Sequence, residues 1–148
     1  MTPHHYRFRN VWSIRASADE VLKALVDVES YPAWWRDIRA VRRLDEDSGT
    51  VQCRAVLPFA LDLRLRRAEE DFDTGRLRID IAGDLEGHCG ARVEEHGSWA
   101  IVQISQEVRL LNPRLRRIQP VLRPILRANH GVMMWRGQRG LRGYLDGS

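Results

Sequence analysis

PRLRRIQPVLRPILRANHGVMMWRGQRGLRGYL, residues 113–145, decides the fold, because it is the only segment long enough for an extended helix. At about 100° per residue, one stripe of that helix collects Ile118, Leu122, Ile125, Val132 and Met133. Asn129 and Arg136 fall within the same stripe. An amide and a guanidinium on an apolar stripe predict that the helix packs against a cavity rather than against a solid core.

Prolines and glycines indicate where this helix begins and what it packs against. Pro120 and Pro124 remove backbone donors, so the helix either starts near Gln119 or is kinked there. Glycine costs up to about 1 kcal/mol inside a helix, which is easiest to understand if another element passes close to the backbone. The alternative is that the last turns fray. The glycines concerned are Gly131, Gly137, Gly140 and Gly143.

Length and charge limit the class of protein. A chain of 148 residues is long enough for one domain with a core and too short for two, so we expect a single domain over residues 1–148. The net charge is +4, and Lys23 is the only lysine. Because acidic residues lie among the arginines along the chain, we interpret most arginines as a solvated sheet face. We therefore expect neither a nucleic-acid partner nor stable membrane insertion.

Several common chemistries lack their motifs in this sequence. The chain has no GxSxG elbow, no P-loop, no GxGxxG after a strand and no HExxH. Its two cysteines have no metal-ligand or disulfide spacing, so we expect no metal and no cofactor. The first ten residues lack the apolar core of a signal peptide, and no run reaches the length of a membrane span. These features predict a soluble, cytoplasmic protein.

The chain before the long helix alternates between apolar and polar residues in the manner of strands. Residues 6–15 form the first strand. Ser17 and Glu20 have capping-box spacing and begin a helix over 18–28, and Pro32 suits a second, short helix. An antiparallel meander follows, with strands at 38–45, 50–57, from Leu61, at 76–82, at 85–95 and at 98–111. Trp34 and Trp35 are neighbours, so we expect at least one of them near a cavity mouth or the surface.

Three stretches carry a resemblance to a known family: SIRASADEVLKALVDVESYPAWW at 13–35, DLEGHCGARVEEHGSWAIVQISQEVRL at 84–110, and RPILRANHGVMMWRGQRGLRGYL at 123–145. In order and periodicity the chain resembles the START-like (SRPBCC) superfamily and, within it, the polyketide cyclase/dehydrase-like proteins. The resemblance implies an α+β helix-grip fold. In that fold, a curved sheet of seven antiparallel strands surrounds the C-terminal helix, with two short helices between strands 1 and 2. It also implies an internal cavity for a mainly apolar molecule.

Polar residues on inward faces are the candidates for ligand contact. Arg136 is the best catalytic candidate, because a guanidinium can hold a carboxylate or stabilise an enolate. The alternative is that Arg136 reaches solvent at the cavity mouth and that Asn129 bonds a strand carbonyl. Gln106 and Asn10 can orient a ligand hydroxyl or carbonyl, or can satisfy each other.

The apolar candidates for the cavity lining are Trp12, Leu122, Ile125 and Met133. Trp12 can stack on a flat ligand or belong to the core. His88 and Cys89 point to opposite faces of a strand, so we interpret Cys89 as a small core residue rather than a nucleophile. His130 falls off the predicted stripe and is interpreted as a surface or packing residue.

The sequence thus predicts a helix-grip domain that binds a small, mainly apolar ligand. The more specific hypothesis is a polyketide cyclase/dehydrase in which Arg136, Asn129 and Gln106 position carbonyls for enolisation and ring closure. The alternative is a carrier or sensor without catalysis, and a polyanion-binding protein is a third, less favoured interpretation. Both a monomer and a homodimer are compatible with the sequence.

Overall fold

The computed structural model describes residues 5–55, 57 and 59–146. β1 (His5–Ile14) is followed by α1 (Ala18–Val26), the single 3-10 turn η1 (Val28–Ser30) and α2 (Tyr31–Trp34). Six further strands come next: β2 (Ile38–Arg43), β3 (Ser48–Cys53), β4 (Leu61–Asp71), β5 (Arg76–Gly83), β6 (Leu85–His96) and β7 (Trp99–Leu110). The chain then enters α3 (Pro113–Arg117) and α4 (Gln119–Asp146).

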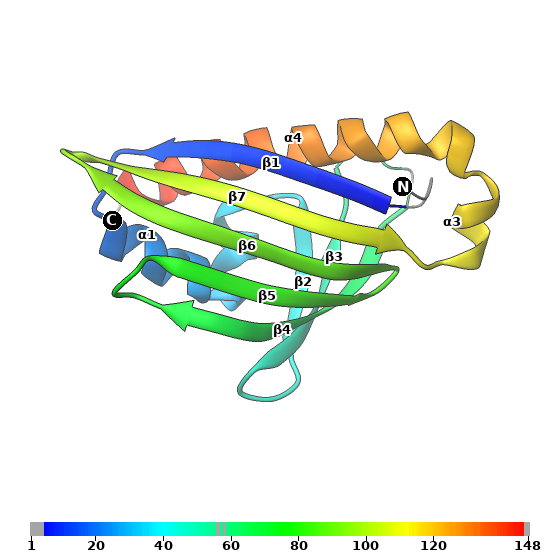
Figure 1. Ribbon diagram of the computed structural model, residues 1–148, viewed down its shortest axis with the longest axis horizontal. Coiled ribbons are helices and arrows are strands. Elements are labelled where there is room, and N and C mark those ends of the chain that lie inside the picture. The colour runs from blue at the N-terminus through cyan, green and yellow to red at the C-terminus, as the bar shows by residue number, and fades with distance from the viewer. Residues whose placement is uncertain (1–4, 56, 58, 147–148) are drawn as a thin grey trace.

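The seven strands form one antiparallel sheet in the order β1-β7-β6-β5-β4-β3-β2 (Figure 1). Short turns join β4 to β5 and β6 to β7, with Gly75 and Gly97 at positive φ, where glycine has no steric penalty. Because β1 pairs with β7, the first and last strands lie side by side. The predicted helix-grip fold is confirmed.

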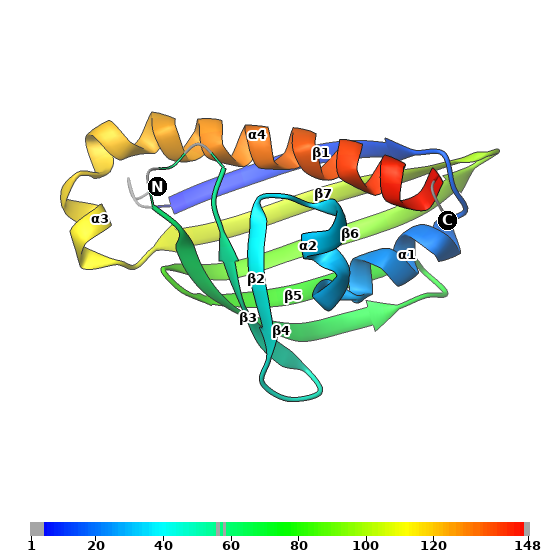
Figure 2. The same cartoon turned by 180° about the vertical axis from the view of Figure 1, so that it is seen from behind.

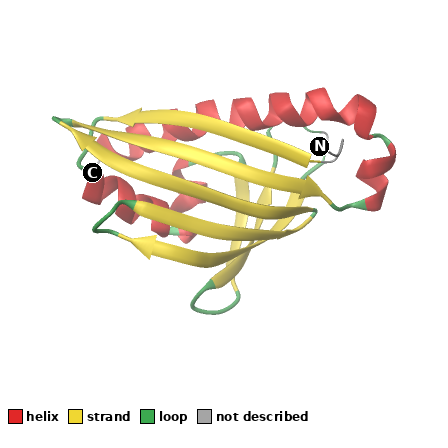
Figure 3. Cartoon of the chain, in the orientation of Figure 1, coloured by secondary structure: helices red, strands yellow, loops and turns green. Residues whose placement is uncertain are grey.

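All the helices of the described chain except α3 lie against one face of the sheet (Figure 2), and the opposite face carries no helix. Figure 3 shows α4 running along the edge formed by β1, with α1 and α2 below it. The sheet side chains that face the helices are mainly apolar, as the alternation predicts. In β7, for example, Ala100, Val102, Ile104 and Val108 are buried.

The beginning of the C-terminal helix differs from a single helix over 113–145. Asn112 caps α3 by accepting hydrogen bonds from the backbone N–H groups of Arg114 and Leu115. The short helix ends at Ile118, and α4 starts at Gln119 with Pro120 in its first turn and Pro124 inside it. Of the two sequence alternatives, a start near Gln119 is therefore correct.

This break changes which face of α4 is buried. The buried stripe is formed by Leu122, Leu126, Asn129, Met134, Gly137 and Leu141. The stripe drawn from the sequence was wrong at two positions, because Ile118 is 51% exposed and Ile125 is 39% exposed. Glycine carries no apolar signal, so the sequence pattern could not show that Gly137 belongs to the packed face.

Two glycines of α4 allow close packing, whereas the other two do not. A Cβ at Gly137 would lie 2.7 Å from Cε2 of Trp35 and 2.8 Å from the Trp12 ring, and one at Gly140 would overlap the carbonyl oxygen of Trp34. No atom lies within 4 Å of a Cβ placed at Gly131 or Gly143. The predicted close approach of another element to the helix backbone is therefore confirmed at Gly137 and Gly140. The last turns are helical, and α4 extends to Asp146.

Trp34 and Trp35 are both buried, and Trp35 lines the cavity described below. They are 7% and 8% exposed. The helix α2 ends between them, because Trp35 has an extended backbone (φ −119°, ψ 92°) and its side chain therefore leaves the helical spacing. The two rings stack at 5.5 Å, and Trp35 meets Trp12 edge-on at the same centroid distance. Together the three indoles pack between α2, β1 and α4.

Candidate functional site

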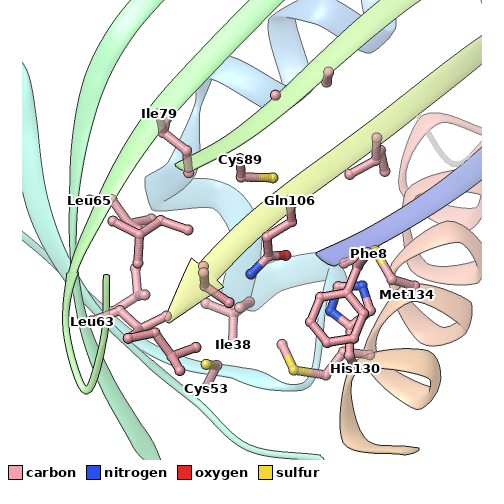
Figure 4. A pocket seen from close by; sticks show the side chains of 18 of the residues that line it. Phe8, Ile38, Cys53, Leu63, Leu65, Ile79, Cys89, Gln106, His130 and Met134 are labelled. Carbon is pink, nitrogen blue, oxygen red and sulfur yellow. The ribbon is translucent and has the colours of Figure 1, made fainter. Parts of the chain in front are cut away.

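A cavity of about 210 Å³ lies between the inner face of the sheet and α4. A row of cross-strand neighbours forms its floor: Ile79 on β5 is opposite Cys89 on β6, Cys89 is opposite Gln106 on β7, and Gln106 is opposite Phe8 on β1. Figure 4 shows the Gln106 amide projecting from β7 into the space between these side chains and His130. Aliphatic, aromatic and sulfur-containing side chains make up most of the lining.

The helix α4 contributes the opposite wall with Leu126, Asn129, His130, Met133 and Met134. Of the residues proposed from the sequence, Gln106, Trp12, Asn129 and Met133 therefore lie in the cavity lining. Leu122 is buried outside the lining, and Ile125 faces outward.

The Asn129 side chain binds the chain that connects β3 to β4. Its Oδ1 accepts hydrogen bonds from the backbone N–H of Ala55 (3.0 Å) and of Leu57 (3.4 Å). Asn129 is only 3% exposed, so these bonds satisfy a carbonyl that would otherwise be buried without a donor. The amide thus has a structural role, although it accepts from the backbone rather than donating to a strand carbonyl.

Arg136, the best catalytic candidate from the sequence, does not line the cavity. Its Nη1 lies 2.8 Å from Oδ1 of Asp37, which is 1% exposed. Among the described residues Asp37 has no other cationic partner, and its Oδ2 accepts no hydrogen bond. The guanidinium is therefore held by a buried carboxylate rather than directed at a ligand. Nothing in the sequence marks Asp37 as buried, since it follows Arg36 in a polar pair.

His130 lines the cavity, contrary to the sequence interpretation. Its ring stacks on Phe8 with a centroid distance of 3.7 Å, and its Nε2 lies 3.1 Å from Oδ1 of Asn10. Asn10 itself is outside the cavity lining and is paired with His130 rather than with Gln106. The stripe drawn from the sequence is rotated about the helix axis relative to the observed buried face of α4. His130 therefore fell outside the predicted stripe, although it borders the cavity.

Burial shifts the pKa of four side chains in the lining, and each shift favours the uncharged form near neutral pH. Burial raises the pKa of the Cys89 thiol to about 12, and burial together with the carboxylate of Asp37 does the same for Cys53. Burial also raises the pKa of Tyr31, whose hydroxyl donates to the Leu25 carbonyl, and lowers the pKa of His130 to about 4. Cys89 faces the cavity as a neutral thiol, which does not favour a nucleophilic role.

The lowered pKa of His130 predicts a loss of stability in acid. The unfolded chain binds this proton near pH 6.5, and the folded chain binds it only near pH 4. The unfolded state therefore holds more protons in that window, and stability falls as the pH drops through it. Relative to His130→Phe, the wild-type protein is expected to lose about 2 kcal/mol more between neutral pH and pH 4. Urea unfolding at a series of pH values measures this difference, and parallel curves for the two proteins would contradict it.

A second hollow of about 300 Å³ adjoins the cavity and shares six lining residues with it. The shared residues are Leu25, Val51, Leu65, Leu77, Arg78 and Ile79. We call this hollow the mouth. Its rim carries seven acidic residues and three arginines, and the acidic residues are Asp27, Glu29, Asp45, Glu46, Asp47, Glu69 and Glu70. A ligand entering here meets a net negative rim before an apolar interior.

The polyketide cyclase/dehydrase and lipid transport family model matches residues 14–117. The chain belongs to this family. The match ends before α4, so it does not cover the helical wall of the cavity. No curated protein matches the chain in sequence.

Solved structures show the same fold at low sequence identity. The Zhui aromatase/cyclase from Streptomyces sp. R1128 is 14% identical with a TM-score of 0.75, over 97% of this chain and 94% of that one. A START superfamily protein from Mycobacterium smegmatis is also 14% identical, with a TM-score of 0.73 over 95% and 97% of the two chains. A conserved protein from Geobacillus kaustophilus is 7% identical with a TM-score of 0.72, over 93% and 97%. Fold, family and cavity together support a domain that binds hydrophobic ligands.

Proposed function

We propose that the protein binds a small, uncharged, mainly apolar molecule of one or two rings, with a hydrogen-bonding group directed at Gln106. The size limit comes from the cavity volume of about 210 Å³. A buried apolar cavity of about 150 Å³ accommodates benzene, so the present cavity holds a somewhat larger ring system. A long polyketide chain folded into several rings would need a larger space.

The preference for an uncharged ligand follows from the lining. Among the described lining residues, Arg78 is the only one charged at neutral pH; it is half exposed and lies 3.6 Å from Asp80. A carboxylate inside the cavity would therefore be desolvated without a dedicated cation, which is strongly unfavourable. The negative charge of the rim of the mouth also disfavours the entry of a negatively charged ligand.

Gln106 is the observation that carries the proposal. Its side chain lies in the cavity lining, and among the described residues it has no hydrogen-bond partner. A ligand hydroxyl or carbonyl can supply one, and such a bond contributes about 0.5–1.5 kcal/mol. This amide, with Phe8 and Cys89 as its cross-strand neighbours, gives the pocket a polar preference.

The experiment is a calorimetric titration with naphthol, naphthalene and naphthoate. Naphthol is expected to bind, and naphthoate to bind at least about tenfold more weakly because its charge is unpaired. Gln106→Leu is expected to weaken naphthol about fivefold to tenfold and to leave naphthalene unchanged. Gln103→Leu is the matched control, since Gln103 lies on the same strand and is exposed. Equal affinities for naphthol and naphthoate, or a Gln106 variant that behaves like the Gln103 variant, would contradict the proposal.

Cyclase or dehydrase activity is the second candidate, and His130 rather than Arg136 favours it. A neutral imidazole beside the cavity can accept a proton from a carbon next to a ligand carbonyl, whereas the Arg136 guanidinium is held by Asp37. In a β-hydroxy ketone, loss of that proton and of the hydroxyl group releases water and forms an enone. Mass spectrometry of the protein incubated with such a ketone tests this candidate. Product formation that His130→Gln abolishes supports catalysis, and binding without product supports the carrier or sensor.

A further inference from the structure

The positive charge of this protein is concentrated in one segment. Residues 108–145 contain nine arginines and no aspartate or glutamate. The other fifteen basic residues and all 20 acidic residues lie elsewhere in the chain, so that part has a net negative charge. Although arginines occur throughout the sequence, the acidic residues that neutralise them are absent from the β7 end, from α3 and from α4 before Asp146.

Within this segment, three aliphatic side chains near the start of α4 point away from the protein. Ile118 is 51% exposed, Val121 is 71% exposed and Ile125 is 39% exposed. They lie at the junction of α3 and α4 and on the first two turns of α4, while Leu122 and Leu126 of the same turns face the core. The start of α4 is therefore apolar on both sides, which indicates that its outer side is covered by something else.

Exposed arginines lie on the same two helices, α3 and the start of α4. They are Arg114, Arg116, Arg117 and Arg127, and none of the four has an ion-pair partner among the described residues. By contrast, the sheet arginines Arg7, Arg92 and Arg109 each lie within 3.2 Å of a glutamate oxygen. At the start of α3, Asn112 rather than an arginine donates to the carboxylate of Asp84 in the β5–β6 turn.

The position in the fold makes this surface accessible. Figure 1 shows α3 and the first turns of α4 at one end of the molecule, beyond the ends of the central strands. We call the surface formed by Ile118, Val121, Ile125 and the four arginines the basic-apolar end.

We propose that the basic-apolar end docks on an anionic lipid surface, with the three aliphatic side chains in the interfacial region and the arginines on lipid phosphates. A basic helical face that also exposes aliphatic residues has the composition of an interfacial element. Nucleic acid would pair with the arginines but offers no partner for three exposed aliphatic side chains. The association is peripheral, since no helix of the described chain is long and apolar enough to cross a membrane.

The test is sedimentation of the full chain with vesicles of phosphatidylcholine alone and of phosphatidylcholine mixed with phosphatidylglycerol. Binding is expected only to the anionic vesicles and is expected to weaken as salt rises. Replacing Arg116, Arg117 and Arg127 by glutamine is expected to weaken it about a hundredfold, at about fivefold per arginine. The double variant Val121→Ser with Ile125→Ser is expected to weaken it by at least about tenfold at unchanged charge.

Matched controls separate this surface from the general charge of the protein. Glutamine at Arg64, Arg66 and Arg92 removes the same charge from the sheet, and Val11→Ser removes an aliphatic side chain that is 63% exposed on β1. Both controls are expected to retain most vesicle binding. The proposal is overturned by absence of binding to anionic vesicles at low salt, or by equal losses in the controls. It is also overturned by duplex DNA binding that outcompetes vesicles and is unaffected by the serine variant. The inference stands independently of the cavity ligand, which is tested by titration.

Discussion

Gly140→Ala is expected to lower the free energy of unfolding by about 3 kcal/mol. The added carbon would overlap the carbonyl oxygen of Trp34, which is backbone and cannot rotate away. Relief of the overlap requires α2 to move away from α4, and that movement disturbs the packing of Trp34 on Trp35. Urea unfolding monitored by tryptophan fluorescence measures the change.

The same helix supplies the control for this prediction. Gly131→Ala and Gly143→Ala place a methyl group where no atom lies within 4 Å. Each is expected to raise the free energy of unfolding by up to about 1 kcal/mol, because alanine is the better helix former. If Gly140→Ala behaves like these two variants, then α2 does not contact α4 as described, and the wall of the cavity beside Trp35 is placed wrongly.

Arg136→Met is expected to lower the free energy of unfolding by about 3 kcal/mol, because it leaves the Asp37 carboxylate buried without a cation. This loss is at the low end of the range for breaking a buried ion pair, because the Arg136 side chain is 30% exposed. Ligand affinity is expected to change little, because Arg136 does not line the cavity. Denaturant unfolding and the naphthol titration, performed on the same variant, separate the two effects.

A double-mutant cycle isolates the contribution of the pair itself. Asp37→Asn combined with Arg136→Met is expected to be less destabilised than the sum of the single variants by at least about 1 kcal/mol. Arg139→Met is the matched control, since Arg139 is exposed on the same helix and contacts Trp135 at 4.8 Å. If Arg136→Met keeps the stability of the wild type but loses ligand binding, then Arg136 contacts the ligand, as the sequence first indicated.

The strands and their inward faces could be predicted because alternation in a sheet is a local property. Ala100, Val102 and Ile104 alternate with more exposed residues and occupy the inner face of β7, and Gln106 lies on the same face, where the sequence placed it. The turns at Gly75 and Gly97 also follow from local preference. The strands were therefore accessible from residue order and periodicity, and the helix-grip fold from the resemblance to the START-like superfamily.

The cavity wall on α4 was less predictable, because it depends on the phase of a helix and on partners distant in sequence. The break at Ile118 and the packed Gly137 rotate the buried face, which moves His130 to the cavity and Ile125 to the surface. The partner of Arg136 lies 99 residues away, and no periodic pattern identifies Asp37. Polar contacts between elements are thus the part of the site that the sequence does not reveal.

Methionine methyl NMR tests the central claim, that the ligand occupies the space between the sheet and α4. The chain has three methionines, and two of them, Met133 and Met134, line the cavity. On titration with naphthol, both methyl resonances, assigned with Met133→Leu and Met134→Leu, are expected to shift under the ring current of the bound aromatic and to saturate at the calorimetric affinity. Saturable naphthol binding that leaves both resonances in place would show that the ligand binds elsewhere and would contradict this account.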